Sequence, residues 1–148
     1  MEELFATVVG LDDAVPTADA LIQDGYEVVM GHGGTGGMIA KSIGQPVVHI
    51  PMDMLDIITA LLKAAKLGNR IGVTSLAVGR EGFDTIREVL GLDVREIIFN
   101  SQNELKEGVE KAIGYGVNVI VGGGVSRKIA AQLQVRSVII EPGKQIVQ

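Results

Sequence analysis

The sequence predicts an α/β fold of two similar Rossmann-like lobes, each built on a parallel sheet. Apolar, β-branched runs alternate along the 148-residue chain with helix-like stretches of roughly ten residues, which is the pattern of βαβ units. The two halves of the chain also resemble each other in sequence. Each half carries a glycine-rich turn directly after an apolar run, at residues 31–37 and 122–124.

The first half contains three predicted strands, each a short apolar run: residues 4–9, 27–30 and 47–50. Two predicted helices lie between them and end at helix-breaking residues: 17–24 between Pro16 and Gly25, and about 36–43 ahead of Gly44, Gln45 and Pro46. The strand that ends at residue 30 therefore leads through the glycine turn directly into a helix.

A longer helix is predicted after Asp53, whose side chain suits an N-cap, with Asp56 placing a negative charge in the first turn. Five apolar residues at helical spacing predict its buried face: Leu55, Ile58, Leu61, Leu62 and Ala65. Gly68 and Asn69 are expected to end this helix.

The second half repeats the alternation of strands and helices. Its predicted strands are residues 70–74, 95–99, 117–121 and 136–140. Its predicted helices are residues 82–90, stopped by Gly91, then 103–114, and a helix from the second glycine turn to about residue 133.

The internal repeat aligns most of the two halves. The aligned pairs are residues 25–31 with 116–122, Ile39-Ala40 with Ile129-Ala130 after one residue is dropped from the turn, 48–51 with 139–142, and 4–9 with 94–99. The strand at 70–74 and the helix after it have no partner. We therefore expect the first lobe to lack an opening strand and helix, which a longer chain or another chain would supply.

This repeat predicts a division into lobe 1 (residues 1–67), lobe 2 (68–140) and a C-terminal segment (141–148). The C-terminal segment either returns toward lobe 1 or leads to a downstream domain. Parallel sheets bind ligands beyond the carboxyl ends of their strands, and both glycine turns follow such ends. The predicted site is therefore the cleft between the lobes.

The composition narrows the class of ligand. The net charge of −5 and the pI near 5.0 argue against a general nucleic-acid or membrane surface, but not against a small anion held by local N–H groups. The chain has no cysteine and two distant histidines, so no metal site is expected. No apolar run is long enough to cross a bilayer, and the acidic N-terminus does not resemble a signal peptide, which favours the cytoplasm.

Strand, glycine turn and helix together form a typical cradle for an anion, because glycines let a ligand approach the backbone and a helix start offers unpaired N–H groups. The candidate ligand-binding residues are His32, Gly33, Gly34, Thr35, Gly36, Asp56, Ser75, Gly123, Gly124 and Ser126. Several of these have a second interpretation. Thr35 could cap its helix, His32 could be a solvated turn residue, Ser75 could bond its own turn, and Asp56 is more simply a helix N-terminal charge.

Two resemblances to nucleotide-binding motifs are incomplete in this sequence. Residues 31–36 satisfy G-x-G-x-x-G, but the acidic residue expected after the next strand is missing. Lys41-Ser42 resembles the end of a phosphate-binding P-loop, but Ala40 stands where that motif needs glycine. The sequence contains no recognisable pair of nucleophile and base, and no cofactor is expected. An enzyme acting on a phosphorylated or nucleotide substrate and a dimerising assembly domain remain as alternatives.

Several short motifs resemble the N-terminal receptor domain of the propionate-catabolism operon regulators (PrpR), which are sigma-54-dependent transcriptional activators. The resemblance is carried by Gly33-Gly34-Thr35, Ile39-Ala40-Lys41, Pro46-Val47-Val48, Ile50-Pro51 and Asp56-Ile57-Ile58. Lys66, Gly68, Leu90-Gly91 and the turn at 122–124 fit as well, so it covers nearly the whole chain.

The resemblance implies a duplicated, chelatase-like sensor that binds its effector between the lobes, 2-methylcitrate for the named members. It implies that Gly33, Gly34 and Thr35 lie at the effector site, with Asp56 at the head of the long helix. An ATPase domain and a DNA-binding helix-turn-helix domain follow in full-length regulators. The family usually has arginine before Gly-Gly-Thr, whereas this chain has His32, a mostly neutral donor.

Overall fold

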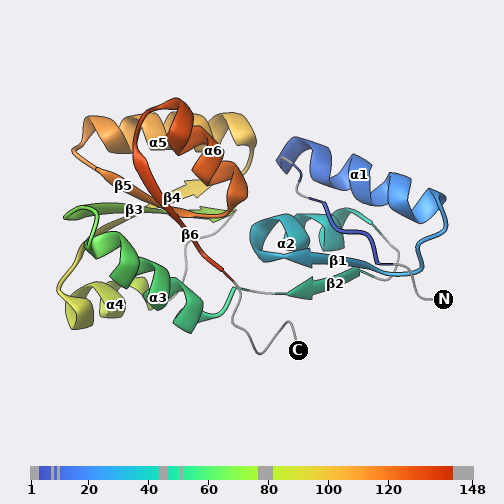
Figure 1. The fold of residues 1–148 in the computed structure, drawn as a ribbon, viewed down its shortest axis with the longest axis horizontal. Helices are drawn as coiled ribbons and strands as arrows, with labels where there is room; N and C mark the ends of the chain where they lie inside the picture. The colour runs from blue at the N-terminus through green and yellow to red at the C-terminus, as the bar shows by residue number, and fades with distance from the viewer. Residues whose placement is uncertain are drawn as a thin grey trace.

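Two parallel sheets organise the computed structural model, which describes residues 4–7, 9, 11–43, 47–50, 52–76 and 82–141 (Figure 1). The small sheet pairs β1 (Val29–His32) with β2 (Val47–Ile50). The large sheet has the order β4-β3-β5-β6, with β3 (Arg70–Leu76), β4 (Asp93–Phe99), β5 (Val119–Gly122) and β6 (Arg136–Ile139). The predicted α/β class with parallel sheets is confirmed.

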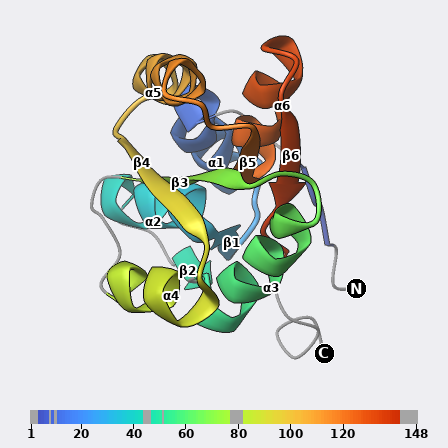
Figure 2. The same cartoon turned by 90° about the vertical axis from the view of Figure 1, so that its left-hand side faces the viewer.

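Helices cover both faces of the large sheet (Figure 2). On one face lie α3 (Met54–Ala65) and α4 (Phe83–Leu90), and on the other lie α5 (Gln102–Gly114) and α6 (Gly124–Gln132). The small sheet packs against α1 (Leu11–Gln23) and α2 (Gly33–Ser42). From β3 onward, every observed boundary lies within two residues of its prediction.

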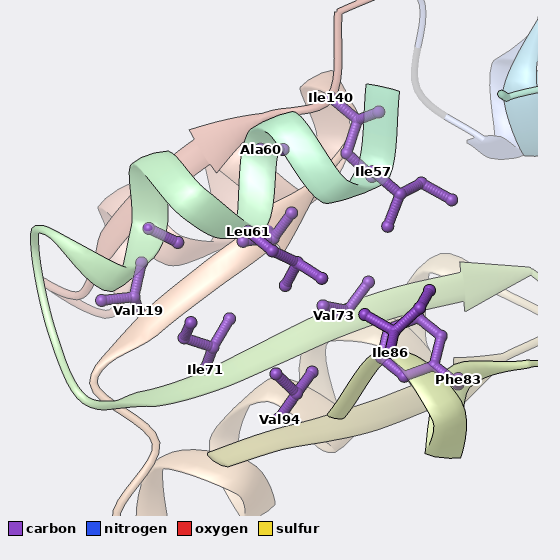
Figure 3. Packing of buried hydrophobic residues seen from close by; sticks show 12 residues of the cluster. Ile57, Ala60, Leu61, Ile71, Val73, Phe83, Ile86, Val94, Val119 and Ile140 are labelled. Carbon is purple, nitrogen blue, oxygen red and sulfur yellow. The ribbon is translucent and has the colours of Figure 1, made fainter. Parts of the chain in front are cut away.

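Helix α3 packs against the large sheet, not against the small one. It follows β2 in the chain, but its residues Ile57 and Leu61 pack with Val73 and Val119 of the large sheet (Figure 3). The chain therefore passes between the lobes ahead of α3, and the boundary predicted at residue 67 does not coincide with this crossing. Of the predicted segment 141–148, Glu141 alone lies within the described residues.

The buried face of α3 differs from the predicted one. The residues that it buries are Ile57, Ala60, Leu61 and Ala64, whereas Leu55 is 67% exposed and Leu62 is 48% exposed. Both stripes have helical spacing, so periodicity could not choose between them. The observed stripe places two alanines against the sheet, which allows the helix to lie close to it.

The N-terminal elements also differ from their predictions. Residues 4–7 and 9 form no strand, and Leu4 is 90% exposed, because no described strand lies beside them to pair with. Helix α1 begins at Leu11 rather than at residue 17 and contains Pro16. Its buried residues Leu11, Ala14 and Ala18 are spaced along one face, so packing extends the helix past the proline.

The first glycine turn is shorter than predicted. Strand β1 runs to His32 and α2 begins at Gly33, so four of the glycines lie inside the helix. The change of direction is made at Gly33, whose φ of +63° is a conformation that glycine adopts readily. The predicted break at residues 44–46 lies outside the described residues.

The repeat is visible in the backbone. Gly25 and Gly116 follow α1 and α5 with φ of +102° and +100°. In the small sheet Gly31 lies opposite His49, and in the large sheet Gly122 lies opposite Ile139. His49 therefore corresponds to Ile139, one residue away from the predicted alignment of the last strands. No helix in the described part of the chain is long and apolar enough to span a membrane.

Candidate ligand-binding site

A cleft of about 700 Å³ lies where the two lobes meet. The N-terminal ends of α2 and α6 both reach it: Gly34 and Thr35 line it from α2, and Gly124 and Ser126 line it from α6. His32 and Gly123, the residues before these helices, line it as well. Six of the ten predicted site residues are therefore brought together in one cavity.

The two helices that point into the cleft lack side-chain caps. Neither His32 before α2 nor Gly123 before α6 makes a capping hydrogen bond, and neither helix has an acidic residue in its first turn. Helices α3 and α5 are capped instead, because the N–H of Leu55 donates to Asp53 Oδ1 at 3.0 Å and that of Glu104 to Ser101 Oγ at 3.2 Å.

The first turn of a helix leaves N–H groups without intrahelical acceptors and carries a partial positive charge. At α3 and α5 a side-chain oxygen and an acidic residue complement this end: Asp56 in α3 and Glu104 in α5. At α2 and α6 nothing comparable is present among the described residues. These two ends therefore suit an anion that binds from the cleft.

Thr74 adds a hydroxyl group that sequence reasoning missed. Its Oγ1 lies 2.8 Å from Ser126 Oγ, and both residues are buried, at 5% and 3% exposure. Gly122 leaves room for this pair, because a Cβ there would lie 2.1 Å from Thr74 Oγ1. Thr74 and Ser126 both line the cleft.

Ser75 was the predicted residue of this strand, but it is not among the residues that line the cleft. It faces the other side of the sheet and donates a 2.6 Å hydrogen bond to Glu96 Oε1. Neighbouring side chains in a strand point to opposite faces, so only one of the two could reach the ligand. The buried Ile71 and Val73 face α3, and counting by two from them assigns Ser75 to that side.

Gly33 and Gly36 have packing roles. Neither lines the cleft. A Cβ on Gly33 would lie 2.7 Å from Met52 Cε, and one on Gly36 would lie 2.1 Å from the carbonyl oxygen of Gly31. Gly36 thus lets α2 lie directly against β1, a role that the glycine pattern alone did not distinguish from ligand binding.

His32 and Asp56 each have one buried polar atom without a hydrogen-bond partner in the described part of the chain. These atoms are His32 Nε2 and Asp56 Oδ2. Burial lowers the pKa of His32 from its usual value, although the charge of Asp56 acts in the opposite direction. His32 is therefore neutral at pH 7, and it offers a ligand a hydrogen bond rather than a charge. Asp56 itself is not a lining residue.

The lowered pKa predicts a pH effect on stability. The unfolded chain protonates His32 near pH 6.5, above the pKa in the folded protein, so stability falls as the pH drops through and below 6.5. We expect His32→Gln to remove part of this fall when the urea midpoint is measured at pH 7.5, 6.5 and 5.5. Parallel midpoint curves for the two proteins would contradict the assignment.

The lining of the cleft is mostly apolar, with hydroxyl, imidazole and backbone groups among the apolar side chains. Among its described residues none is Lys, Arg, Asp or Glu. The described residues also include no group of three His, Cys, Asp or Glu side chains that could hold a metal ion. The arrangement suits recognition of an anion by N–H and O–H donors.

Comparisons with known proteins agree with this architecture. Residues 2–148 match the family described as propionate catabolism activator. A solved structure described as an NtrC family transcriptional regulator from Clostridium acetobutylicum matches with a TM-score of 0.85 and 22% sequence identity. The match covers 94% of this chain and 74% of that one. No curated protein matches the sequence.

Proposed function

Because the chain belongs to the propionate catabolism activator family, we propose that it is the ligand-sensing domain of a transcriptional regulator that acts in the cytoplasm. The match over residues 2–148 confirms the family resemblance predicted from the sequence. An ATPase domain and a DNA-binding domain would receive the signal, in a longer chain or in a partner protein.

The proposed ligand is a small anionic metabolite, either a carboxylate such as 2-methylcitrate or a phosphorylated compound. The paired, uncapped N-termini of α2 and α6 are the observation that carries this proposal. They approach one cleft from different lobes, so a single anion could accept N–H bonds from both. Thr35, Thr74 and Ser126 would add hydroxyl contacts, and neutral His32 a further hydrogen bond.

A ligand held in this way would favour one arrangement of the lobes. Each lobe contributes one helix end, so binding is strongest when both ends reach the anion. The chain crosses between the lobes after β2, which leaves a connection at which the lobes could move. Ligand binding would shift the population toward the closed arrangement, and the attached domains would respond to this shift.

Thermal unfolding tests the proposal. We expect one class of carboxylate or phosphate compound to raise the midpoint in a panel of 2-methylcitrate, citrate, smaller carboxylates, sugar phosphates, NAD and ATP. A ligand at 100 times its Kd adds about 2.7 kcal/mol of stability. For a chain of this size the midpoint then rises by roughly 5–10 °C.

Gly123→Val is the variant that assigns the shift to this cleft. A Cβ at Gly123 meets nothing within 4 Å, so valine would enter the cleft without disturbing the fold. Gly114→Val is the matched control, because a Cβ there is equally free and Gly114 lies at the end of α5 away from the cleft. We expect Gly123→Val to lose the ligand shift and Gly114→Val to keep it.

Other outcomes would replace the proposal. An equal ligand-induced shift in both variants would show that the ligand binds outside the cleft. A shift with NAD or ATP alone would favour the enzyme alternative. A mass that doubles with concentration, with no ligand effect, would favour the assembly domain.

A further inference from the structure

Helix α3 has a second apolar face, which points away from the large sheet. Its inner residues Ile57 and Leu61 pack against the strands (Figure 3). On the outer side Leu55 is 67% exposed and Leu62 is 48% exposed. The apolar residues of a surface helix usually gather on the one side that faces the core, so this second face suits a further contact.

The outer face has the spacing of a helix-pairing seam. Its members follow one another at intervals of three, four and three residues: Leu55, Ile58, Leu62 and Ala65. This is the a and d pattern of a coiled coil. Ile58 packs partly against the core, whereas Ala65 is exposed. We call these four residues the outer stripe. None of them lines the cleft, so the following inference does not depend on the proposed ligand.

The polar group next to the outer stripe is already bonded within the helix. Thr59 follows Leu55 by one turn and therefore lies on the same side of α3. Its Oγ1 donates a 2.8 Å hydrogen bond to the carbonyl oxygen of Leu55, which leaves the methyl group of Thr59 available for packing. A second helix can cover this position without leaving the hydroxyl group unsatisfied.

The charges along α3 indicate what kind of helix fits the outer stripe. Asp53 and Asp56 lie at the N-terminal end of α3, and Lys63 and Lys66 lie at its C-terminal end. A parallel copy of α3 would place like charges side by side. An antiparallel copy instead places the acidic end of each helix beside the basic end of the other, and the two helix dipoles then oppose each other favourably.

One antiparallel register satisfies the apolar and the charged patterns together. Two apolar pairs and one charge pair share a midpoint within one residue of Ala60: Leu55 with Ala65, Ile58 with Leu62, and Asp53 with Lys66. A two-fold axis at the level of Ala60 therefore brings each member of a pair opposite the other. Such a self-complementary surface is what a symmetric dimer requires.

We propose that α3 binds the same helix of a second copy of this chain, antiparallel and through the outer stripe. The twelve residues of α3 span about 18 Å. A contact of this length lies at the low end of the sizes of protein–protein interfaces, so the dimer is weak and depends on concentration. It forms whether or not the cleft holds a ligand.

Sedimentation equilibrium tests the proposal. We expect the mean mass to rise from that of one chain toward that of two as the concentration increases from micromolar to millimolar. Leu62→Glu would bury a charge in the outer stripe and should raise the dissociation constant at least about tenfold. Val89→Glu is the matched control, because Val89 is 77% exposed on α4 and lies outside the outer stripe. This control should dimerise like the unmodified chain.

A second variant and a separate readout keep the test independent of folding and of ligand binding. The urea midpoint of Leu62→Glu in dilute solution checks that the monomer is folded. Ala65→Glu, at an exposed position of the outer stripe, should weaken the dimer as well if Leu62→Glu does not fold. The ligand-induced thermal shift is measured in the same variants, so the dimer and the proposed ligand site can fail separately.

Disulfide formation tests the antiparallel register. The sequence has no cysteine, so Leu55→Cys and Ala65→Cys each give a single thiol. In the proposed register these two positions face each other. The two copies of position 55 lie about 15 Å apart along the axis, which is too far for a disulfide. We expect a mixture of the two proteins to form the mixed disulfide much faster than either protein alone forms its own.

Three results would overturn the proposal. A mass that stays at one chain over the whole concentration range would show that the outer stripe does not bind a second copy. Equal weakening of the dimer by Leu62→Glu and Val89→Glu would show that the contact does not depend on the outer stripe. Faster cross-linking of Leu55→Cys with itself than with Ala65→Cys would show that the helices do not pair antiparallel.

Discussion

Gly36→Ala is expected to destabilise the protein by about 3 kcal/mol, at the upper end of the range for overpacking. The new Cβ would lie 2.1 Å from the carbonyl oxygen of Gly31 and 2.9 Å from its Cα. These are backbone atoms of β1, so no side-chain rotation relieves the overlap and α2 must move away from the strand. The thermal midpoint should fall by roughly 10 °C for a chain of this length.

Gly37→Ala is the control for this prediction. Gly37 is the next residue of α2, and its Cβ would make an ordinary 3.4 Å contact with His49 Cε1. Alanine inside a helix is favoured over glycine by roughly 0.5–1 kcal/mol, so this variant should be neutral or slightly more stable. Equal midpoints for the two variants would show that the close approach of α2 to β1 is not what requires glycine at position 36.

The internal repeat supplies an independent reason why Gly36 allows α2 to lie close to β1. With one residue dropped from the turn, Gly36 corresponds to Ser126, and Gly31 corresponds to Gly122. A Cβ on Gly122 would lie 2.8 Å from Ser126 Cβ. Both lobes therefore use glycine at the end of the strand to let the next helix lie close, and the large lobe tolerates serine on the helix side.

The fold class and the second-half elements could be predicted because several signals agree there. Gly91 and Gly116 follow α4 and α5 with positive φ, and Ser101 caps α5. In the first half the signals conflict. Glycine is both a turn former and a residue that permits close packing, and the sequence alone does not say which role applies at residues 33–37.

The predictions for the N-terminal residues fail because tertiary contacts decide the structure there. Residues 4–9 have the composition of a strand, but a strand also requires a neighbour, and none is described beside them. Pro16 suggested a helix boundary, yet packing of Leu11 and Ala14 holds the turns before it in α1. In both cases the structure of the segment is decided by what lies next to it and not by its composition alone.

The location of the candidate site was predictable from topology, since both glycine turns follow parallel strands and strand ends share one edge of a sheet. The side chains that reach the site were harder to predict. Thr74 and Ser75 are adjacent in sequence, and only the register of β3 shows that Thr74 joins Ser126 while Ser75 joins Glu96. The ligand-binding role of the lining residues remains a prediction, which Gly123→Val and its control Gly114→Val test.

Leu61→Ala is expected to cost 2–5 kcal/mol, the usual range for removing a fully buried leucine and leaving a cavity. Leu61 is 0% exposed and lies in the centre of the cluster between α3 and the large sheet (Figure 3). The predicted face of α3 grouped it with Leu62, which is 48% exposed. Leu62→Ala should therefore change the urea midpoint much less, and equal losses would support the predicted face instead.

The same pair of variants separates stability from ligand binding. Leu61 is not among the residues that line the cleft, so Leu61→Ala should lower the starting midpoint and leave the ligand-induced shift in place. Gly123→Val should leave the starting midpoint in place and remove the ligand-induced shift, because its side chain enters the cleft without meeting the core. If Leu61→Ala also removed the shift, the site would depend on how α3 packs against the large sheet, and sensing would then be coupled to this packing as well as to the helix ends.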